Sequence, residues 1–325
     1  MTPVLHERFP QLRDTLPWLR LGTAPSPVRE LTDLPVRVPV WLKDDGVFGD
    51  GGWGGNKVRK LEWLLAEAIR RRKRTLVTVG GLGTNWGLAT ARYGREHGLR
   101  TAIALVDQPV DDHVRAQLQR LRESGATLHF THTKARTVLA VPYLLARHRR
   151  PYVIPPGGST PIGVLGYVEA AFELAAQVAA GELPEPAHIV TAVGSGGTAA
   201  GLLLGLELAG LHRTEVVAVV VNDTLRLDRG SLTRSARRTA DLLSARGAEL
   251  PALRLAPDRL RVVTDQLGPG YGHATAAGRD AHELVPHLPL EPVYTAKAFA
   301  ALLDLAGGAA AGPVVFLQTN GPRQT

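Results

Sequence analysis

The sequence predicts an α/β protein with two open, parallel-type sheets flanked by helices. Between residues 75 and 154, short β-rich runs alternate with helical stretches, and a second strand-helix-strand series begins at residue 188. Strands separated by helices of this length form right-handed βαβ units on a parallel sheet. Each series opens with a strand, a glycine-rich turn and a helix, and in such sheets ligands bind at the carboxyl ends of the strands. We therefore expect one ligand cleft between two lobes.

The elements follow from local patterns along the chain. Apolar residues at positions 61, 64, 65, 68 and 69 have helical spacing and predict a helix, with Asn56 as a reasonable N-cap. The Pro- and Gly-rich segment 155–161 predicts a junction between the lobes, and the Arg-rich segment 225–253 predicts helix and loop at the surface. The other expected elements are strands at 75–79, 101–106, 127–131, 152–154, 188–193 and 215–221, and helices at 86–97, 111–124, 137–149 and 199–211.

The composition is that of a globular protein and excludes several classes. The chain has 325 residues, of which 44% are hydrophobic and 21% charged, and this length favours two lobes over one core. It has no Cys, which excludes disulfides, thiolate metal sites and a cysteine nucleophile. Charged residues within the first twenty argue against a signal sequence, and the apolar stretch 199–211 is too short to span a bilayer. We expect a cytoplasmic protein without a membrane partner.

The formal net charge of +8 could indicate a nucleic-acid partner. The densest basic run, at residues 70–74, follows the apolar stripe of the first helix, where basic residues complement the helix dipole and stay solvated. We therefore expect no nucleic-acid partner. The eleven His residues show no metal-ligand spacing, and His129 and His132 would point to opposite faces of a strand, so no metal is expected.

A glycine loop follows the strand at 188–193 and opens the next helix. Its glycines let backbone amides approach an anion, and the helix N-terminus adds a favourable partial charge, so the loop predicts a bound phosphate. Two alternatives remain. A dinucleotide could bind here, with Asp223 on a ribose hydroxyl, or the glycines could serve packing alone. The loop consists of Gly194, Ser195, Gly196, Gly197 and Thr198.

A second glycine-rich loop, at 51–55, leads to Lys57 and Lys60, two of only six lysines in the chain. A lysine in such a place can form a Schiff base if desolvation or a neighbouring cation lowers its pKa. The alternative is a surface loop with solvated lysines. A lysine loop and a separate phosphate loop are together what pyridoxal phosphate requires, since its aldehyde is held by an amine and its phosphate elsewhere.

Five motifs stand out along the chain: GGNKVRKLE at 54–62, the turn at 80–85, PGGS at 156–159 with 163–167, GYG at 270–272 and PVYT at 292–295. They resemble those of the D-cysteine desulfhydrase and 1-aminocyclopropane-1-carboxylate deaminase family. The resemblance runs from about residue 36 to residue 321 and implies a fold-type II enzyme that uses pyridoxal 5'-phosphate, with the fold of the tryptophan-synthase β-subunit and the cofactor cleft between the lobes. We place a large cofactor-binding domain at 1–61 and 171–325, a smaller α/β domain at 62–170, and expect a homodimer.

The resemblance also implies residue roles. Lys57 would be the Schiff-base lysine, Lys60 and the loop at 194–198 would hold the phosphate, and Asn85 would contact the phenolic oxygen of the cofactor. The expected catalytic residues are Lys57, Thr84, Tyr271 and Tyr294, and the expected substrate contacts are Thr84, Asn85, Trp86, Gly158, Tyr271 and Tyr294.

The chain departs from the family pattern at two places. Family members usually have Ser-Asn followed by Gln or His, whereas this chain has Thr84, Asn85 and Trp86. The Thr84 hydroxyl could bind a carboxylate or act on a proton, while Trp86 would fill space normally left open. Near the C-terminus, the usual His-Thr-Gly-Gly becomes Gln-Thr-Asn-Gly at 318–321.

One position divides the family by chemistry. In ring-opening deaminases an acidic residue contacts the pyridine nitrogen, whereas desulfhydrases have a Thr there, as this chain does in Thr295. Thr319 is another possible neutral partner. A neutral hydroxyl leaves the ring nitrogen largely unprotonated and the cofactor a weaker electron sink. Such a sink suits β-elimination, in which a leaving group takes the electrons.

The sequence thus predicts a lyase that acts on a small amino acid and releases a 2-oxo acid and ammonia. In this hypothesis Lys57 removes the α-proton as general base. The alternatives within the fold are ring opening of 1-aminocyclopropane-1-carboxylate and a specialised biosynthetic reaction. Outside this activity, a nicotinamide-dependent dehydrogenase and a non-catalytic amino-acid-binding homologue remain open.

Overall fold

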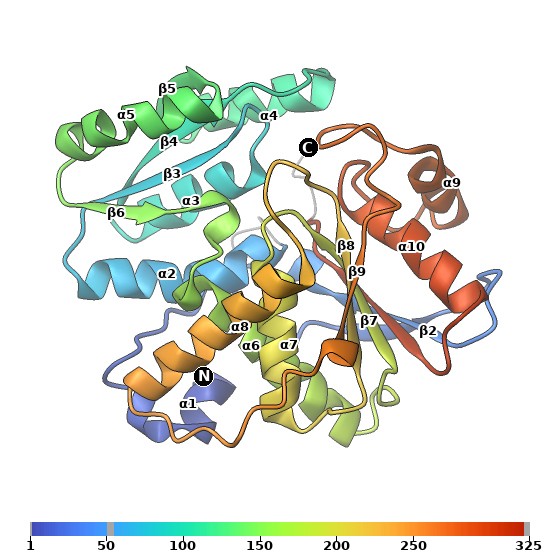
Figure 1. The fold of residues 1–325 in the computed structure, drawn as a ribbon. Helices are drawn as coiled ribbons and strands as arrows, with labels where there is room; N and C mark the ends of the chain where they lie inside the picture. The colour runs from blue at the N-terminus through green and yellow to red at the C-terminus, as the bar shows by residue number, and fades with distance from the viewer. Residues whose placement is uncertain (1, 51–54, 322–325) are drawn as a thin grey trace.

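The computed structural model describes residues 2–50 and 55–321, and in this part of the chain the strands form two sheets (Figure 1). The larger sheet has the order β1-β2-β10-β7-β8-β9, in which β1 and β2 pair antiparallel and all other neighbours pair parallel. The predicted strands at 188–193 and 215–221 are confirmed as β7 and β8, whereas the other four were not predicted. The strands are β1 (Val28–Leu31), β2 (Val40–Asp44), β7 (His188–Val193), β8 (Glu215–Val220), β9 (Leu260–Val263) and β10 (Val314–Gln318).

The smaller sheet is entirely parallel, in the order β5-β4-β3-β6, and each of its strands was predicted. Helices α3 and α4 cover one face, where Leu88 and Leu121 pack on Ile103. Helix α5 covers the other face through Leu144. The elements are β3 (Thr75–Gly81), α3 (Asn85–Glu96), β4 (Arg100–Val106), α4 (Asp112–Glu123), β5 (Thr127–His132), α5 (Lys134–Arg147) and β6 (Pro151–Ile154).

The larger sheet is covered on both faces. Helices α6, α7 and α8 pack on one face and α9 and α10 on the other (Figure 1). Successive residues of β7 alternate between these two cores, since Ile189 belongs to the first and Val190 to the second. Burial of both faces explains the continuous apolar runs that made β7 and β8 predictable. The helices are α6 (Pro161–Ala179), α7 (Gly197–Ala209), α8 (Arg229–Ala245), α9 (Ala276–Leu284) and α10 (Thr295–Gly307).

Helices α2 (Asn56–Arg70) and α6 connect the two sheets. They cross at Gly166, where a Cβ atom would lie 2.3 Å from the carbonyl oxygen of Arg59. The predicted domain boundaries, at 61/62 and 170/171, fall inside α2 and α6. The division into domains at these positions remains a prediction. The remaining helical segments are short: α1 (Val4–Arg8) and the 3-10 turns η1 (Pro10–Leu12), η2 (Asp45–Val47), η3 (Pro156–Gly158) and η4 (Pro257–Arg259).

Helix α6 was not predicted. It is apolar around most of its circumference and lacks the one-sided stripe that marks a surface helix. By length and composition it could also cross a membrane, but 78% of its most apolar window is buried inside the fold. Its composition is therefore that of a core helix.

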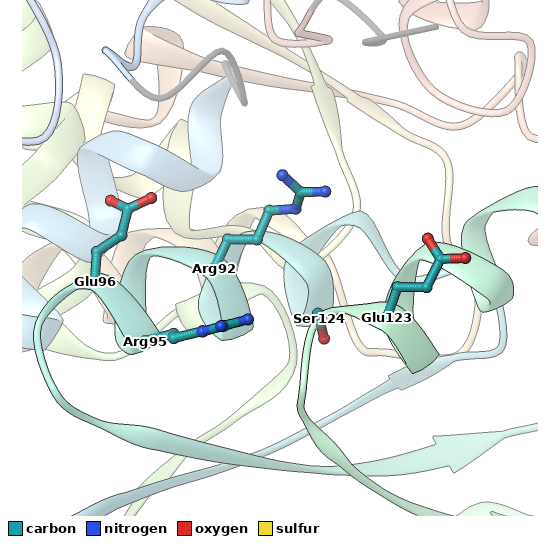
Figure 2. A pocket seen from close by; sticks show the side chains of 5 residues that line it. All are labelled: Arg92, Arg95, Glu96, Glu123 and Ser124. Carbon is teal, nitrogen blue, oxygen red and sulfur yellow. The ribbon is translucent and has the colours of Figure 1, made fainter.

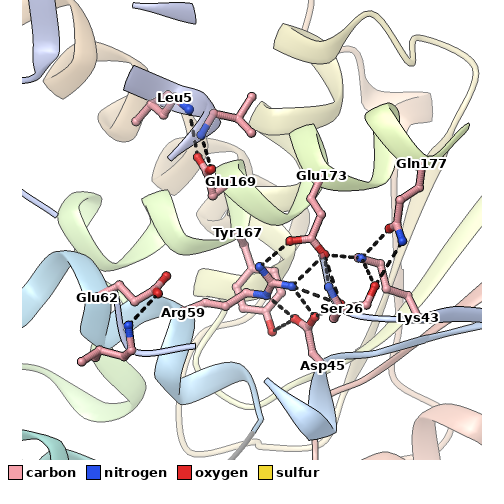
Figure 3. A network of polar contacts seen from close by, with 12 residues as sticks. Leu5, Ser26, Lys43, Asp45, Arg59, Glu62, Tyr167, Glu169, Glu173 and Gln177 are labelled. Atoms are coloured by element: carbon pink, nitrogen blue, oxygen red, sulfur yellow. Dashed lines mark hydrogen bonds and ion pairs between the residues drawn. The ribbon is translucent and has the colours of Figure 1, made fainter. Parts of the chain in front are cut away.

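A buried ionic cluster lies where α2, α6 and the end of β2 meet (Figure 3). The Arg59 guanidinium donates to Asp45 at 2.8 and 2.7 Å and to Glu173 at 3.0 Å. Lys43 donates to Glu173 at 2.5 Å and to Gln177 at 2.7 Å. Two hydroxyl groups complete the cluster, those of Ser26 and Tyr167, which donate to Asp45 at 2.7 and 2.9 Å.

The charges of this cluster compensate one another. Burial alone would raise the pKa of Glu173, but the neighbouring Arg59 and Lys43 outweigh it and lower the pKa to about 2. The carboxylate therefore stays ionised and holds both cations. Because Arg59 lies on α2 and Glu173 on α6, the cluster fixes how these two helices lie against each other.

Removing Arg59 tests this role. Arg59→Leu leaves Asp45 and Glu173 buried without their main cation, and breaking a buried ion pair in this way costs about 3–5 kcal/mol of unfolding free energy. The matched control is Arg70→Leu on the same helix: Arg70 is 40% exposed, and its partner Glu67 keeps the Arg71 guanidinium at 2.6 Å, so its loss should cost about 1 kcal/mol or less. Urea denaturation of both variants measures the difference. Equal losses in the two variants would contradict the assignment.

Glu62, also on α2, predicts a pH dependence. It accepts from the Leu21 N–H at 3.0 Å, and burial raises its pKa from 4.5 to about 8. A carboxyl that binds its proton more tightly when folded contributes stability that is complete below pH 4.5 and lost as the pH rises through about 8. Each unit of the raised pKa is worth about 1.4 kcal/mol.

Glu62→Gln keeps an oxygen acceptor for Leu21 and cannot ionise. We therefore expect the unfolding free energy of the parent protein to fall, relative to this variant, between pH 5 and pH 8.5. Urea denaturation at several pH values across this range measures the change. A difference that does not vary with pH would refute the expectation.

Candidate active site

Lys57 lies in the first turn of α2, which begins at Asn56. The predicted N-cap is wrong by one residue: Gly55 caps the helix with φ 91°, and a Cβ there would lie 2.5 Å from the Thr319 carbonyl oxygen. The Asn56 side chain instead reaches Thr198 of the glycine loop, with 3.4 Å between Nδ2 and Oγ1. The upstream part of the lysine loop, Gly51 to Gly54, lies outside the described residues.

The structure brings Lys60 and the glycine loop together. The Lys60 Nζ donates to the Gly157 carbonyl at 3.2 Å, and a Cβ on Gly197 would lie 3.2 Å from the same Nζ. Gly196 has φ 87° and caps α7, so the N–H groups of the first turn of α7 begin at this loop. Lys60 thus lies at a helix N-terminus, as the phosphate prediction requires.

Ser159 belongs to the same site. Its Oγ accepts from the Gly197 N–H at 3.0 Å and donates to the Ser195 Oγ at 2.9 Å. Residues 155–161 were predicted as a lobe junction, and Ser159 was part of the PGGS motif but had no predicted role. A hydroxyl beside two glycines in a turn was the available signal.

Burial makes both amines unusually acidic. It lowers the pKa of Lys57 to about 8, against an opposing effect of Glu291, and that of Lys60 to about 7, with the Lys57 charge acting in the same direction. Lys60 forms no ion pair with a carboxylate of the described residues. An anion beside Lys60 would therefore be stabilised, while Lys57 supplies an amine that loses its proton near neutral pH. The chemistry of these groups fits a phosphorylated aldehyde.

Two predicted tyrosines form a pair next to this loop. The Tyr294 hydroxyl donates to the Tyr271 hydroxyl at 2.9 Å, and the rings meet edge to face. A Cβ on Gly194 would lie 2.8 Å from the Tyr294 ring. Glu291, which was not predicted, accepts from the Tyr294 and Val293 N–H groups at 2.9 and 3.0 Å and so fixes the segment before α10.

The two predicted neutral partners are buried. Thr295 begins α10, and its Oγ1 accepts from the Glu291 N–H at 2.7 Å. The Thr319 carbonyl accepts from the Asn56 N–H at 3.2 Å, which places Thr319 beside the turn that carries Lys57.

The small sheet contributes the segment 84–86. Thr84 caps α3, and its Oγ1 accepts from the Gly87 N–H at 3.1 Å, while Asn85 Oδ1 accepts from Gln117 of α4. Trp86 is buried in the core and donates to Thr78 at 2.8 Å, and a Cβ on Gly158 would lie 2.5 Å from its ring. The indole thus packs on Gly158, and the expected substrate contacts of Trp86 and Gly158 stay predictions.

A separate cavity of about 430 Å³ lies at the far end of α3 (Figure 2). None of the predicted site residues lines it. Among the described residues, no group of three or more His, Asp or Glu could hold a metal ion. The lining residues are Arg92, Arg95, Glu96, Glu123 and Ser124.

Comparison with known proteins identifies the family of the chain. The family described as pyridoxal-phosphate dependent enzyme matches residues 19–320. The chain belongs to this family. It is 34% identical to D-cysteine desulfhydrases of Salmonella paratyphi A and of Salmonella choleraesuis strain SC-B67, over 94% of each chain.

Solved structures agree with this family. An ACC deaminase homologue has a TM-score of 0.79 at 27% identity, covering 98% of this chain and 95% of that one. A threonine deaminase of T.th., at 20% identity, has a TM-score of 0.66 and covers 99% and 98%.

The predicted fold class, cofactor and enzyme class are thereby confirmed: the protein is a fold-type II enzyme that depends on pyridoxal phosphate, and its relatives support a lyase or deaminase. Membership of this family argues against the alternative of a nicotinamide-dependent dehydrogenase. Asp223, its expected ribose ligand, accepts from the Tyr271 N–H at 3.2 Å in the structure.

Substituting the two lysines separately tests their roles. Lys57→Ala should abolish turnover and the visible absorbance of covalently bound cofactor. If Lys60 holds the phosphate as predicted, Lys60→Ala should keep the covalent link but weaken cofactor affinity about 10- to 100-fold, because a charged hydrogen-bond donor is lost. Lys73→Ala, beyond the end of α2, is the control. Borohydride reduction and peptide mass spectrometry locate the link, and a labelled residue other than Lys57 would refute the assignment.

Proposed function

We propose that the protein catalyses β-elimination from a small amino acid, in the manner of a D-cysteine desulfhydrase, and releases a 2-oxo acid and ammonia. The observation that carries this proposal is the neutral residue Thr295. Its buried hydroxyl accepts the Glu291 N–H and carries no charge, and its own proton can be donated to an unprotonated ring nitrogen. The nearby carboxylate of Glu291 is engaged by two backbone N–H groups. The names of the relatives support the same reaction.

The candidate residues have complementary tasks. When bound, the cofactor supplies an aldehyde that holds the substrate amine and withdraws electrons from the α-carbon. Lys60, Ser159 and the first turn of α7 bind the phosphate and set the position of the ring. Lys57 takes the α-proton, and a pKa of about 8 lets a useful fraction of this amine accept a proton at neutral pH.

The tyrosine pair would act on the substrate side. Burial raises the pKa of Tyr271 and of Tyr294, so both hydroxyls stay protonated. Because Tyr294 donates to Tyr271, the Tyr271 proton is directed to another acceptor. That acceptor would be the leaving group, which departs with the electron pair of the broken β-bond and takes up a proton. Water then hydrolyses the remaining enamine to the 2-oxo acid and ammonia.

Thr84 and Asn85 are proposed to bind the substrate carboxylate and the phenolic oxygen of the cofactor, respectively. Trp86 and Gly158 are proposed to shape the same side of the substrate pocket. We further propose a homodimer in the cytoplasm, with domains at 1–61 and 171–325 and at 62–170. The family resemblance supports these proposals.

Ring opening of 1-aminocyclopropane-1-carboxylate is the second candidate. The similarity to the ACC deaminase homologue favours it, whereas Thr295 argues against it. A specialised biosynthetic reaction is a further alternative, favoured by the unusual Thr84 and Trp86.

A panel of D- and L-amino acids with 1-aminocyclopropane-1-carboxylate separates these candidates. We expect D-cysteine to yield pyruvate, sulfide and ammonia in equal amounts, with Lys57→Ala as the blank. Coupled assays for oxo acid and ammonia measure each reaction. Production of 2-oxobutyrate from the cyclopropane substrate would favour ring opening, and no product from any member would refute the proposed elimination.

A further inference from the structure

The orientation of the Asn85 amide is chemically important. An Asn side chain offers a carbonyl acceptor on one side and an NH₂ donor on the other, in groups of nearly equal size. At Asn85, the rotation of the side-chain amide decides whether its carbonyl oxygen or its NH₂ group faces the cofactor. A neighbouring residue that hydrogen-bonds one end of the amide would fix which end faces the cofactor.

Two residues of α4 provide that constraint. Gln117, which is 3% exposed, donates through Nε2 to Asn85 Oδ1. Arg120 Nη1 donates to Gln117 Oε1 at 3.3 Å. A guanidinium has donors and no acceptor, so the Gln117 carbonyl must face Arg120 and its NH₂ must face Asn85. The same reasoning turns the Asn85 carbonyl toward Gln117.

We propose that Arg120 and Gln117 are positioning residues that orient Asn85 so that its amide nitrogen donates to the phenolic oxygen of the cofactor. The proposal rests on the cofactor contact proposed above for Asn85. Neither Gln117 nor Arg120 needs to touch the cofactor, because each acts through the next amide. A donor favours the ionised form of the phenolic oxygen, whereas a carbonyl in the same place would disfavour it.

The backbone around Asn85 supports this arrangement. Thr84 caps α3 through the Gly87 N–H, so Asn85 is held as the first residue of the helix. Leu88 of α3 and Leu121 of α4 lie in one core cluster. With both helices fixed, the remaining freedom at Asn85 is rotation of its side chain, and Gln117 restricts it.

The decisive variant is Gln117→Glu in the full-length, cofactor-loaded enzyme. A carboxylate accepts and does not donate, so Asn85 would have to turn its NH₂ toward residue 117 and its carbonyl toward the cofactor. The visible band of the bound cofactor reports the ionised phenolic oxygen and the near-ultraviolet band the protonated one. We expect the ratio of visible to near-ultraviolet absorbance to fall by roughly tenfold. Gln119→Glu is the matched control, since Gln119 is an exposed residue of the same helix that bonds Glu123.

Two further variants keep the test decisive. Gln117→Met and Arg120→Met remove the constraint without reversing it, and should lower the ratio by smaller amounts even if Gln117→Glu does not fold. In an Asn85→Leu background, Gln117→Glu should have no further spectral effect, because its action passes through Asn85.

A spectrum of Gln117→Glu or Gln117→Met identical to that of the Gln119→Glu control would overturn the inference. So would an undiminished effect of Gln117→Glu in the Asn85→Leu protein. These spectra need no substrate. Failure of the amino-acid panel therefore refutes the proposed elimination without touching this inference, and an unchanged spectrum refutes the inference alone.

Discussion

The buried contact of Arg59 with Asp45 and Glu173 is the interaction on which the rest of the site depends. It joins α2, α6 and the turn that follows β2 at one point. Lys57 and Lys60 lie on either side of Arg59 on the same helix. The ion pairs of Arg59 therefore fix the position of the helical turn that carries both amines. Because each charge in the cluster is compensated, the helix can be held by ions without leaving a buried charge alone.

In the candidate site, by contrast, the positive charge of the lysines is only partly compensated by nearby carboxylates. Lys60 has no carboxylate partner within residues 2–50 and 55–321, and both amines give up protons more readily than exposed lysines do. Such an arrangement costs stability in the empty protein and favours an anionic, amine-reactive ligand. The glycine loop, with Gly196 at positive φ, and Ser159 complete a surface that suits a phosphate.

Local patterns in the sequence predicted much of the fold. Alternating strands and helices identified the whole small sheet, together with β7, α7 and β8. The few polar residues of helix α6 are buried rather than solvent-facing, and β9 has only four residues, so neither has a strong periodic signal. For the site, glycine and lysine motifs identified Lys57, Lys60 and the loop at 194–198. No role was predicted for Gln117 or Ser159 because each contacts a residue distant in the sequence, and the contacts of Glu291 are with backbone N–H groups, which leave no pattern in the sequence. Trp86 packs in the core, and its expected contact with substrate stays a prediction.

The close crossing of α2 and α6 at Gly166 has a consequence for sequence divergence. Only a hydrogen atom fits between Gly166 and the Arg59 carbonyl, so any larger residue would push α2 outward, one residue away from Lys60. A relative could thus keep every lysine, tyrosine and loop glycine and still lose the alignment of its amines. The lysine and phosphate-loop motifs alone would then overstate the activity expected of such a homologue, and the residue at this helix crossing would be the better guide to whether it is still an enzyme.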